Sequence, residues 1–276
     1  MNNFGSFGIH YLSWAAALLL SALQFSYGQF YNGVRQTALS FSSVSYYQDV
    51  FSAVQNPALF SPGEQVEIKS FYSPSPFGLN ELALLGAGAS FSLSGTRVTT
   101  SIASYGYSLY RENTLMISAA ANMFGFNAGL SLQAAHVNIK GYGTSLVPVF
   151  SAGIRYPLFP FLSVGSSFSN LANASWSNTN DQIGQTSLFG IRYEEEDFLA
   201  LSFTLKNESG YKAEQLAGLE VKPSEYLLLM AGMQFTTRQY STGISFIYMG
   251  IVADYATVIH PILGLSHQFA LGYTIR

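Results

Sequence analysis

Histidine, serine and aspartate are the residues of this chain that could form a hydrolytic site. Asp254 lies six residues before His260, and Ser266 is adjacent to His267. A hydrolase needs a nucleophile, a base and an orienting acid within hydrogen-bond reach of one another. Nothing in the spacing aligns these groups, and neither histidine stands in an H-x-x-x-H or H-x-E arrangement. We therefore expect no enzyme, no metal and no cofactor.

Two further features limit the chemistry. The chain has no cysteine, which excludes disulfides, thiolate metal sites and a cysteine nucleophile. The acidic run Glu194–Asp197 is better explained as a solvated hairpin tip, because four consecutive acids cannot converge on one cation without a folded loop around it. The 12 Lys and Arg residues form no basic stripe, so no nucleic-acid partner is expected.

The most unusual property of the composition is its low charge. Charged residues make up 10% of the chain and hydrophobic residues 49%, whereas soluble domains carry about 25% charged residues. Outside the N-terminus the apolar runs are short, as in residues 226–233, and a spanning helix needs about 20 apolar residues. Dispersed apolar residues among many Gly, Tyr, Phe, Ser and Thr are typical of a membrane β-barrel.

Alternation of apolar and small polar residues supports this interpretation. In residues 199–206 the odd positions are Leu, Leu, Phe and Leu, and the even positions are Ala, Ser, Thr and Lys. Residues 126–133, 239–248 and 268–275 show the same pattern. A soluble β-sandwich would place Lys, Glu and Asp on its polar face. The small polar face seen here suits a lumen of limited width.

About fourteen such segments follow one another. They lie near 65–72, 82–94, 97–110, 114–124, 126–139, 147–157, 162–171, 186–194, 199–207, 214–222, 226–236, 240–249, 251–257 and 266–275. In lipid an open sheet edge would leave backbone N–H and C=O groups without partners, so the sheet must close. We predict an all-β fold, an antiparallel transmembrane β-barrel of about 14 strands located in the bacterial outer membrane and contacting its lipid.

The N-terminal 63 residues differ from the rest. A ten-residue apolar run, 14–23, suits a signal peptide, and we expect cleavage near Gly28, so that residues 1–28 are the signal. Residues 29–63 lack sustained alternation and contain the turn Asn56-Pro57-Ala58. We expect them to form a plug inside the barrel, which residues 64–276 make.

Charged residues on the polar faces of the predicted strands should face the lumen. Arg or Lys on the lipid face near the midplane would cost about 2–4 kcal/mol. Ion pairs with Asp49 of the plug or among themselves could hold the plug in place. The charges assigned to the lumen are Arg155, Arg192, Lys206, Glu220 and Lys222.

The N-terminal segment reads G-x-R-x-x-A-L…D-x-x-S-x-x-x-N-P-A. This pattern resembles the start of the FadL-like outer-membrane barrels, including the PorV and PorQ branch of Bacteroidota. Residues 105–113 and 260–267 also look like short members of that branch. The residues that match the N-terminal pattern are Gly33, Arg35, Ala38, Leu39, Asp49, Ser52, Asn56, Pro57, Ala58 and Leu59.

The resemblance implies fourteen strands, an N-terminal hatch and one of two roles. FadL-type members pass hydrophobic molecules through an opening in the wall, and PorV-type members serve the type IX secretion machinery. Partners would accordingly be hydrophobic small molecules or secretion proteins. The alternative is a scaffold barrel that docks partner membrane proteins without conducting a substrate. A channel predicts an apolar cavity under the hatch, whereas a scaffold predicts a lumen filled tightly by residues 29–63.

Overall fold

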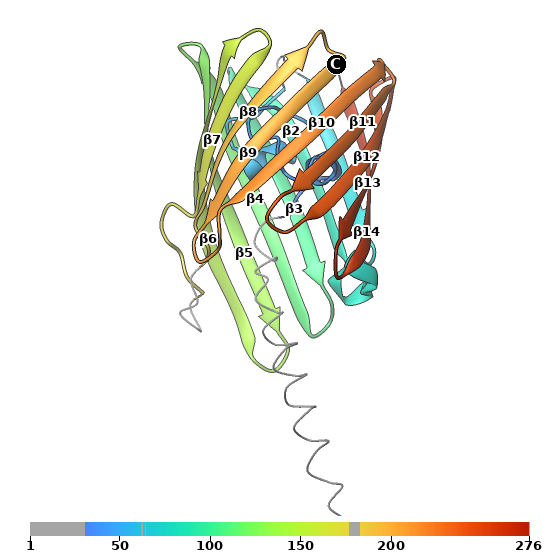
Figure 1. Ribbon diagram of the computed structural model, residues 1–276. Coiled ribbons are helices and arrows are strands. Elements are labelled where there is room, and N and C mark those ends of the chain that lie inside the picture. Colours follow the sequence, from blue (N-terminus) through green and yellow to red (C-terminus); the bar gives the residue numbers. More distant parts are fainter. Residues whose placement is uncertain (1–30, 62, 64, 177–182, 276) are drawn as a thin grey trace, which may run out of the picture.

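The computed structural model describes residues 31–61, 63, 65–176 and 183–275, so the expected signal segment 1–28 lies outside the described residues. Within this part, fourteen antiparallel strands form one closed barrel, as predicted (Figure 1). The strands are β1 (Val66–Ser73), β2 (Leu84–Leu93), β3 (Thr96–Gly106), β4 (Tyr110–Met123), β5 (Phe126–Ile139), β6 (Gly143–Phe159), β7 (Leu162–Ser169), β8 (Thr186–Glu195), β9 (Leu199–Glu208), β10 (Glu214–Ser224), β11 (Leu227–Gln234), β12 (Gln239–Tyr248), β13 (Ile251–His260) and β14 (Gly264–Ile275).

Each strand pairs with its sequence neighbour, and the first and last strands pair with each other. In that closing pair Val66 lies opposite Ile275, and Tyr72 lies opposite Phe269. Every strand therefore has two neighbours, which removes the open edges that lipid does not tolerate.

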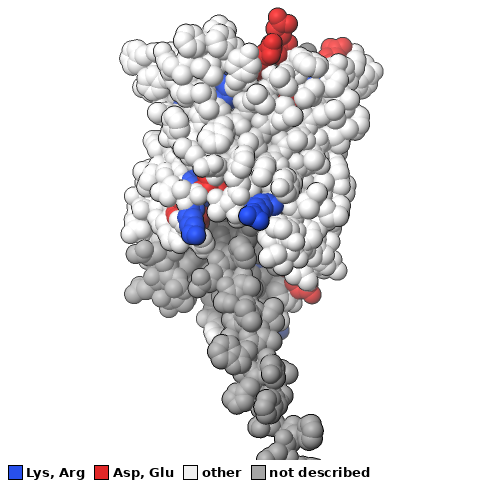
Figure 2. Space-filling model, viewed as in Figure 1, with Lys and Arg blue, Asp and Glu red and all other residues white. Residues whose placement is uncertain are grey.

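The predicted alternation decides which side chains face outward. In β5 the outward Leu130 is 64% exposed, whereas the inward Gln133 is buried. In β9 Leu201 is exposed and its neighbour Ser202 is buried. The face shown in Figure 2 carries few charged residues between the two ends of the barrel. This outer surface is apolar enough to lie in lipid.

The two ends of the barrel differ in their connections. At the end where β1 begins and β14 ends, six turns are two or three residues long. At the other end the loops run from 3 to 16 residues, the longest lying between β7 and β8. Short turns lie on the periplasmic side of bacterial barrels and longer loops outside, so we call these the periplasmic and outer ends.

The wall is also unequal in height. Strands β4 and β5 have 14 residues each and β6 has 17, whereas β7 and β11 have 8. Figure 1 shows the green β5 and its neighbours reaching beyond the orange strands at the lower, outer end.

Residues 31–61, here called the inner segment, lie inside the barrel (Figure 1, blue). They contain two short helices, α2 (Val34–Ala38) and α3 (Ser52–Gln55). Among the described residues, no helix is long and apolar enough to cross a membrane. Two 3-10 turns, η1 (Pro76–Gly78) and η2 (Asn80–Leu82), lie in the loop between β1 and β2.

The outward orientation of the apolar faces can be tested at Leu132, in the middle of β5. Arg placed there would stand in the hydrocarbon region, and we expect Leu132→Arg to lower the free energy of unfolding by about 2–4 kcal/mol. Leu132→Met should stay close to the wild type. The measurement is the yield of the heat-modifiable folded band after refolding into vesicles. Equal yields for both variants would contradict the assigned faces.

Candidate functional site

The inner segment contacts the barrel wall along most of its length. Tyr31, Phe51 and the inward Phe71 of β1 form a buried aromatic cluster, in which the rings of Phe51 and Phe71 meet edge to face at 4.9 Å. Edge-to-face pairs at this distance stabilise by about 0.5–1.5 kcal/mol beyond the area that they bury.

A cluster of four charges joins the inner segment to two strands, β1 and β13, which flank β14. Lys69 of β1 lies 2.7 Å from the Asp49 carboxylate and also contacts Asp254 of β13. Arg35 of α2 approaches the same Asp254 at 3.2 Å. The side chains of Lys69, Asp49 and Asp254 are at most 2% exposed. Two cations and two anions balance, so that no charge of this set is buried alone.

Hydrogen bonds hold the Asp49 carboxylate in place. Gln36 donates to it through Nε2 at 2.8 Å, and the backbone N–H of Phe51 donates at 3.0 Å. Nearby, the phenol of Tyr47 donates to Glu67 of β1. Burial raises the pKa of Tyr47, and the neighbouring Glu67 carboxylate raises it further, so the phenol stays protonated.

A second polar group lies across the barrel. Arg192 of β8 contacts Glu220 of β10 and, at 3.4 Å, Glu194. The ring of Tyr46, in the inner segment, lies 3.9 Å from the guanidinium carbon of Arg192, within the range of a cation–π contact. Arg155 of β6 donates through Nε to the carbonyl of Ser45.

The Asn56-Pro57-Ala58 turn ties the inner segment to β5 and β6. The Asn56 amide donates to the carbonyls of Val44 and Ile154, and its oxygen accepts from the N–H of Ala58. This turn therefore joins two parts of the inner segment to the wall.

Glycines on the inward face of the wall make room for the inner segment. A Cβ at Gly153 would lie 1.9 Å from Asn56 Oδ1, and one at Gly129 would lie 2.3 Å from the carbonyl oxygen of Pro57. Both distances are far below contact, so only glycine fits. Similar close approaches to the inner segment occur at Gly88, Gly165, Gly190, Gly218, Gly232 and Gly243.

The structure thus brings the N-terminal motif residues together within the lumen. Gly33 precedes α2, where a Cβ would lie 2.7 Å from the Phe51 ring. Arg35 and Asp49 belong to the charge cluster, and residues 56–59 make the turn described above. Ala38 and Leu39 lie at the end of α2, and Ser52 begins α3.

The five charges assigned to the lumen have different positions. Arg192 and Glu220 are buried partners, and Arg155 is partly buried beside the inner segment. Lys206 is 35% exposed and pairs with Glu208 at 2.8 Å near the outer end of β9. Lys222 is exposed near the periplasmic end of β10, where the pairing with β11 shifts register between residues 221 and 224.

Sequence reasoning missed Lys69 and Asp254 as partners of the inner segment. Both stand at inward positions of their strands, so the alternation could have identified them as lumen charges. Their proximity depends on the closure of β1 onto β14, which the alternation alone does not show.

The candidate hydrolytic residues are not assembled. Asp254 binds Arg35 and Lys69, whereas His260 lies six residues further along β13, about 20 Å for an extended strand. The His267 ring instead meets the hydroxyl of Tyr255 through Nδ1. Within the described residues, no group of three or more His, Asp or Glu side chains is arranged to hold a metal ion.

The outer half of the lumen carries an apolar surface. Val147 and Val149 of β6 face inward and are buried, and Ile183, from the loop between β7 and β8, packs against them. Trp176 of the same loop is partly buried at this cluster. The loop thus folds onto the inward face of the tall side of the wall.

Closed topology, an apolar exterior and a polar interior define a transmembrane barrel of the outer-membrane type. No family model and no curated protein sequence matches this chain. Solved structures of the same fold do match, although their sequence identities are low.

The toluene transporter TbuX of Ralstonia pickettii aligns with a TM-score of 0.67 at 13% identity, over 91% of this chain and 99% of TbuX. The monoaromatic hydrocarbon channel CymD gives 0.62 at 15% identity, over 88% and 97%. The Pseudomonas putida toluene transporter TodX gives 0.60 at 11%, over 89% and 96%. At the level of structure, this chain has the FadL-like 14-strand barrel fold that these transporters share.

The charge cluster can be tested at Lys69. Lys69→Met leaves two buried carboxylates with one cation, and removing one partner of a buried pair costs about 3–5 kcal/mol. We expect the free energy of unfolding to fall by that amount in a urea titration of vesicle-embedded protein. Lys206→Met, which breaks a partly exposed pair, should cost at most about 1 kcal/mol. Equal losses in the two variants would contradict the cluster.

The glycine contacts can be tested at Gly129. In Gly129→Ala the new methyl group meets the backbone of Pro57, so the inner segment must shift while the strands still pair. We expect faster protease cleavage within residues 31–61 of the folded barrel. Gly184→Ala is the matched control, because its Cβ would meet only the flexible Glu208 side chain at 3.2 Å. Protection as in the wild type for Gly129→Ala would refute the close fit.

Proposed function

We propose that this protein is a channel through which small hydrophobic compounds, such as monoaromatic hydrocarbons, enter across the outer membrane. The observation that carries the proposal is the closed barrel with its N-terminal segment packed inside the lumen, a fold shared with TbuX, CymD and TodX. TbuX and TodX are toluene transporters, and CymD is a monoaromatic hydrocarbon channel.

Two features of the lumen support an apolar substrate. Val147, Val149 and Ile183, with Trp176 packed against them, form a buried apolar cluster in the outer part of the lumen. Below it, the inner segment acts as a hatch, held by the charge cluster and by the Arg192 group. An uncharged compound would pass these fixed charges without the desolvation cost that an ion incurs.

In this proposal the inner segment must shift for a compound to pass. Its contacts with the wall include an apolar cluster and hydrogen bonds that lie at separate points of the circumference. A partial shift that keeps the charge cluster intact would open a path along β9 to β12, where the segment is held through hydroxyl groups of Ser40, Ser241 and Thr204.

A second candidate function is a scaffold barrel that docks partner membrane proteins and conducts nothing. The tight fit of the inner segment against the inward glycines favours it, because a filled lumen leaves little room for transport. A role as an accessory of type IX secretion is a separate candidate, and its support is the sequence resemblance of the N-terminal motif and of residues 105–113 and 260–267.

A reversible disulfide between the inner segment and β12 would distinguish the two candidate functions. The Oγ atoms of Ser40 and Ser241 lie 2.7 Å apart, and the chain has no cysteine of its own. In Ser40→Cys/Ser241→Cys an oxidised pair would fasten the inner segment to β12. The assay is uptake of radiolabelled toluene by cells that lack other such channels, with single Ser241→Cys as the control.

The channel proposal predicts toluene uptake above that of empty cells, a loss of about tenfold on oxidation and recovery with a reductant. Uptake at the level of empty cells, in wild type and in the reduced variant alike, would overturn the channel and favour the scaffold. If oxidation leaves the uptake unchanged, the protein is still a channel, but the proposal that the inner segment must shift is refuted.

A further inference from the structure

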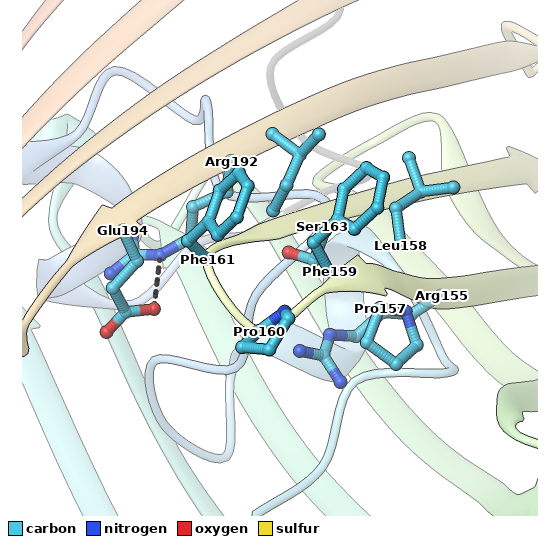
Figure 3. Close-up of a pocket in the computed structure, with 10 residues that line it drawn as sticks. Arg155, Pro157, Leu158, Phe159, Pro160, Phe161, Ser163, Arg192 and Glu194 are labelled. Carbon is cyan, nitrogen blue, oxygen red and sulfur yellow. Dashed lines mark hydrogen bonds and ion pairs between the residues drawn. The ribbon is translucent and has the colours of Figure 1, made fainter.

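One buried carboxylate of the lumen lacks the cation that the others have. Four carboxylates are buried among the described residues, those of Asp49, Glu112, Glu220 and Asp254. Lysine or arginine pairs with three of them, whereas none of the ion pairs among the described residues includes Glu112. Even the partly exposed Glu194, near the periplasmic end, is paired with Arg192, as Figure 3 shows. A buried charge without a counter-charge is costly, so Glu112 requires an explanation.

Glu112 lies on the inward face of β4, near the outer end of the lumen. It is the third residue of the strand, and it is 8% exposed. Among the described residues, the phenol of Tyr110 donates a hydrogen bond to its carboxylate. The neighbouring Arg111 and His136 stand at positions that alternate with the inward ones, so their side chains face away from it. One phenol satisfies one of the roughly four acceptor sites of a carboxylate.

The inward face beside Glu112 leads over small side chains to an apolar cluster. Thr114, two residues further along β4, lies opposite Ala135 of β5, and Ala135 lies opposite Val147 of β6. With strands about 4.8 Å apart and a rise of about 3.4 Å per residue, the Cα atoms of Glu112 and Val147 are about 12 Å apart. Val147 packs with Ile183 in the buried apolar cluster of the outer lumen. The side chains on the wall between the carboxylate and this cluster, Thr114 and Ala135, are small.

A carboxylate next to an apolar surface matches the chemistry of an amine that carries an aromatic ring. An ammonium group would neutralise Glu112 and donate charge-assisted hydrogen bonds to its open acceptor sites. The ring would lie over Thr114 and Ala135 and contact the cluster at Val147. A metal ion fits less well, because Ca²⁺ takes six to eight oxygen ligands and this site offers one carboxylate. An aromatic anion would be repelled by the same carboxylate.

We propose that the outer lumen binds small aromatic amines in their ammonium form and that Glu112 determines this selectivity. The inference rests on the proposed channel and narrows its substrate class, from hydrophobic compounds in general to those that combine a ring with an ammonium group. Tyr110 holds the carboxylate in position through its hydrogen bond. Hydrocarbons gain nothing from the carboxylate and bind there more weakly than the amines.

The test measures binding to the purified, folded protein in a nonionic detergent by isothermal titration calorimetry. The probes share one ring and differ in the group attached to it. Benzylamine carries an ammonium group at neutral pH, benzyl alcohol a neutral hydroxyl group and benzoate a carboxylate. We expect benzylamine to bind about tenfold more tightly than benzyl alcohol, because a hydrogen bond between two charged groups is stronger than one to a neutral donor. Benzoate should give no measurable binding.

Three variants complete the test. Glu112→Gln keeps the size of the side chain and removes its charge, so it should weaken benzylamine binding about tenfold and leave benzyl alcohol binding unchanged. Val147→Ser makes the ring contact polar and should weaken the binding of both compounds. Glu81→Gln is the matched control, because it removes an exposed carboxylate in the loop between β1 and β2, at the same end of the barrel. It should bind all three probes as the wild type does.

Two results would overturn the amine site. The first is equal benzylamine binding by the wild type and by Glu112→Gln, both showing the heat-modifiable folded band. The second is binding of benzyl alcohol or benzoate by the wild type as tight as that of benzylamine, which would show that no ion pair forms. Toluene uptake separates this outcome from failure of the channel. Uptake without a preference for benzylamine keeps the channel and refutes the amine site, whereas Glu112-dependent benzylamine binding without uptake keeps the site and refutes the channel.

Discussion

Closure of β1 onto β14 is the constraint on which the rest of the structure depends. The strands lie in lipid, where an unpaired backbone edge is too costly to persist, so the two ends of the chain's sheet must meet. That meeting places Lys69 two strands away from Asp254 at the same height of the lumen. The inner segment adds Arg35 and Asp49 at this seam, so the charges that hold the segment also join the strands on both sides of the closure.

The inner segment and the wall are fitted to each other by two opposite means. At the seam, charged side chains reach inward and require partners. On β5 to β12, inward positions are instead glycines, such as Gly129 and Gly153. Because glycine has no side chain, the inner segment lies directly against the wall there. Polar contacts there come mainly from hydroxyl groups, Asn56 and Arg155. The segment is consequently held by ion pairs next to the β1–β14 closure and by weaker hydrogen bonds on the opposite side of the lumen.

Much of the barrel could be predicted from the sequence, because alternation reports directly which face of a strand meets lipid. The predicted segments overlap all of the strands, and the inward faces of 126–133, 199–206, 239–248 and 268–275 were identified correctly. Alternation does not tell how far along a strand the lumen encloses a side chain, and Lys222 is exposed near the end of β10. The pairing of Lys69 with Asp254 could not be predicted from the alternation. Alternation tells whether a side chain faces the lumen or the lipid, but it does not tell which residues of two different strands lie at the same level of the barrel. The path of residues 31–61 shows no hydrophobic periodicity, and it follows from contacts with most of the strands, which no local pattern encodes.

The unequal height of the wall has a consequence for the membrane around the protein. A flat bilayer has one thickness, whereas strands of 14 to 17 residues stand on one side of this barrel and strands of 8 residues stand elsewhere in the wall, β7 directly beside β6. The barrel must therefore lean, or the lipid next to β7 and β11 must thin, at a cost of a fraction of a kcal/mol for each ångström of mismatch. Either response gives the protein a preferred orientation about the membrane normal, because the tall strands β4 to β6 lie together in one part of the wall.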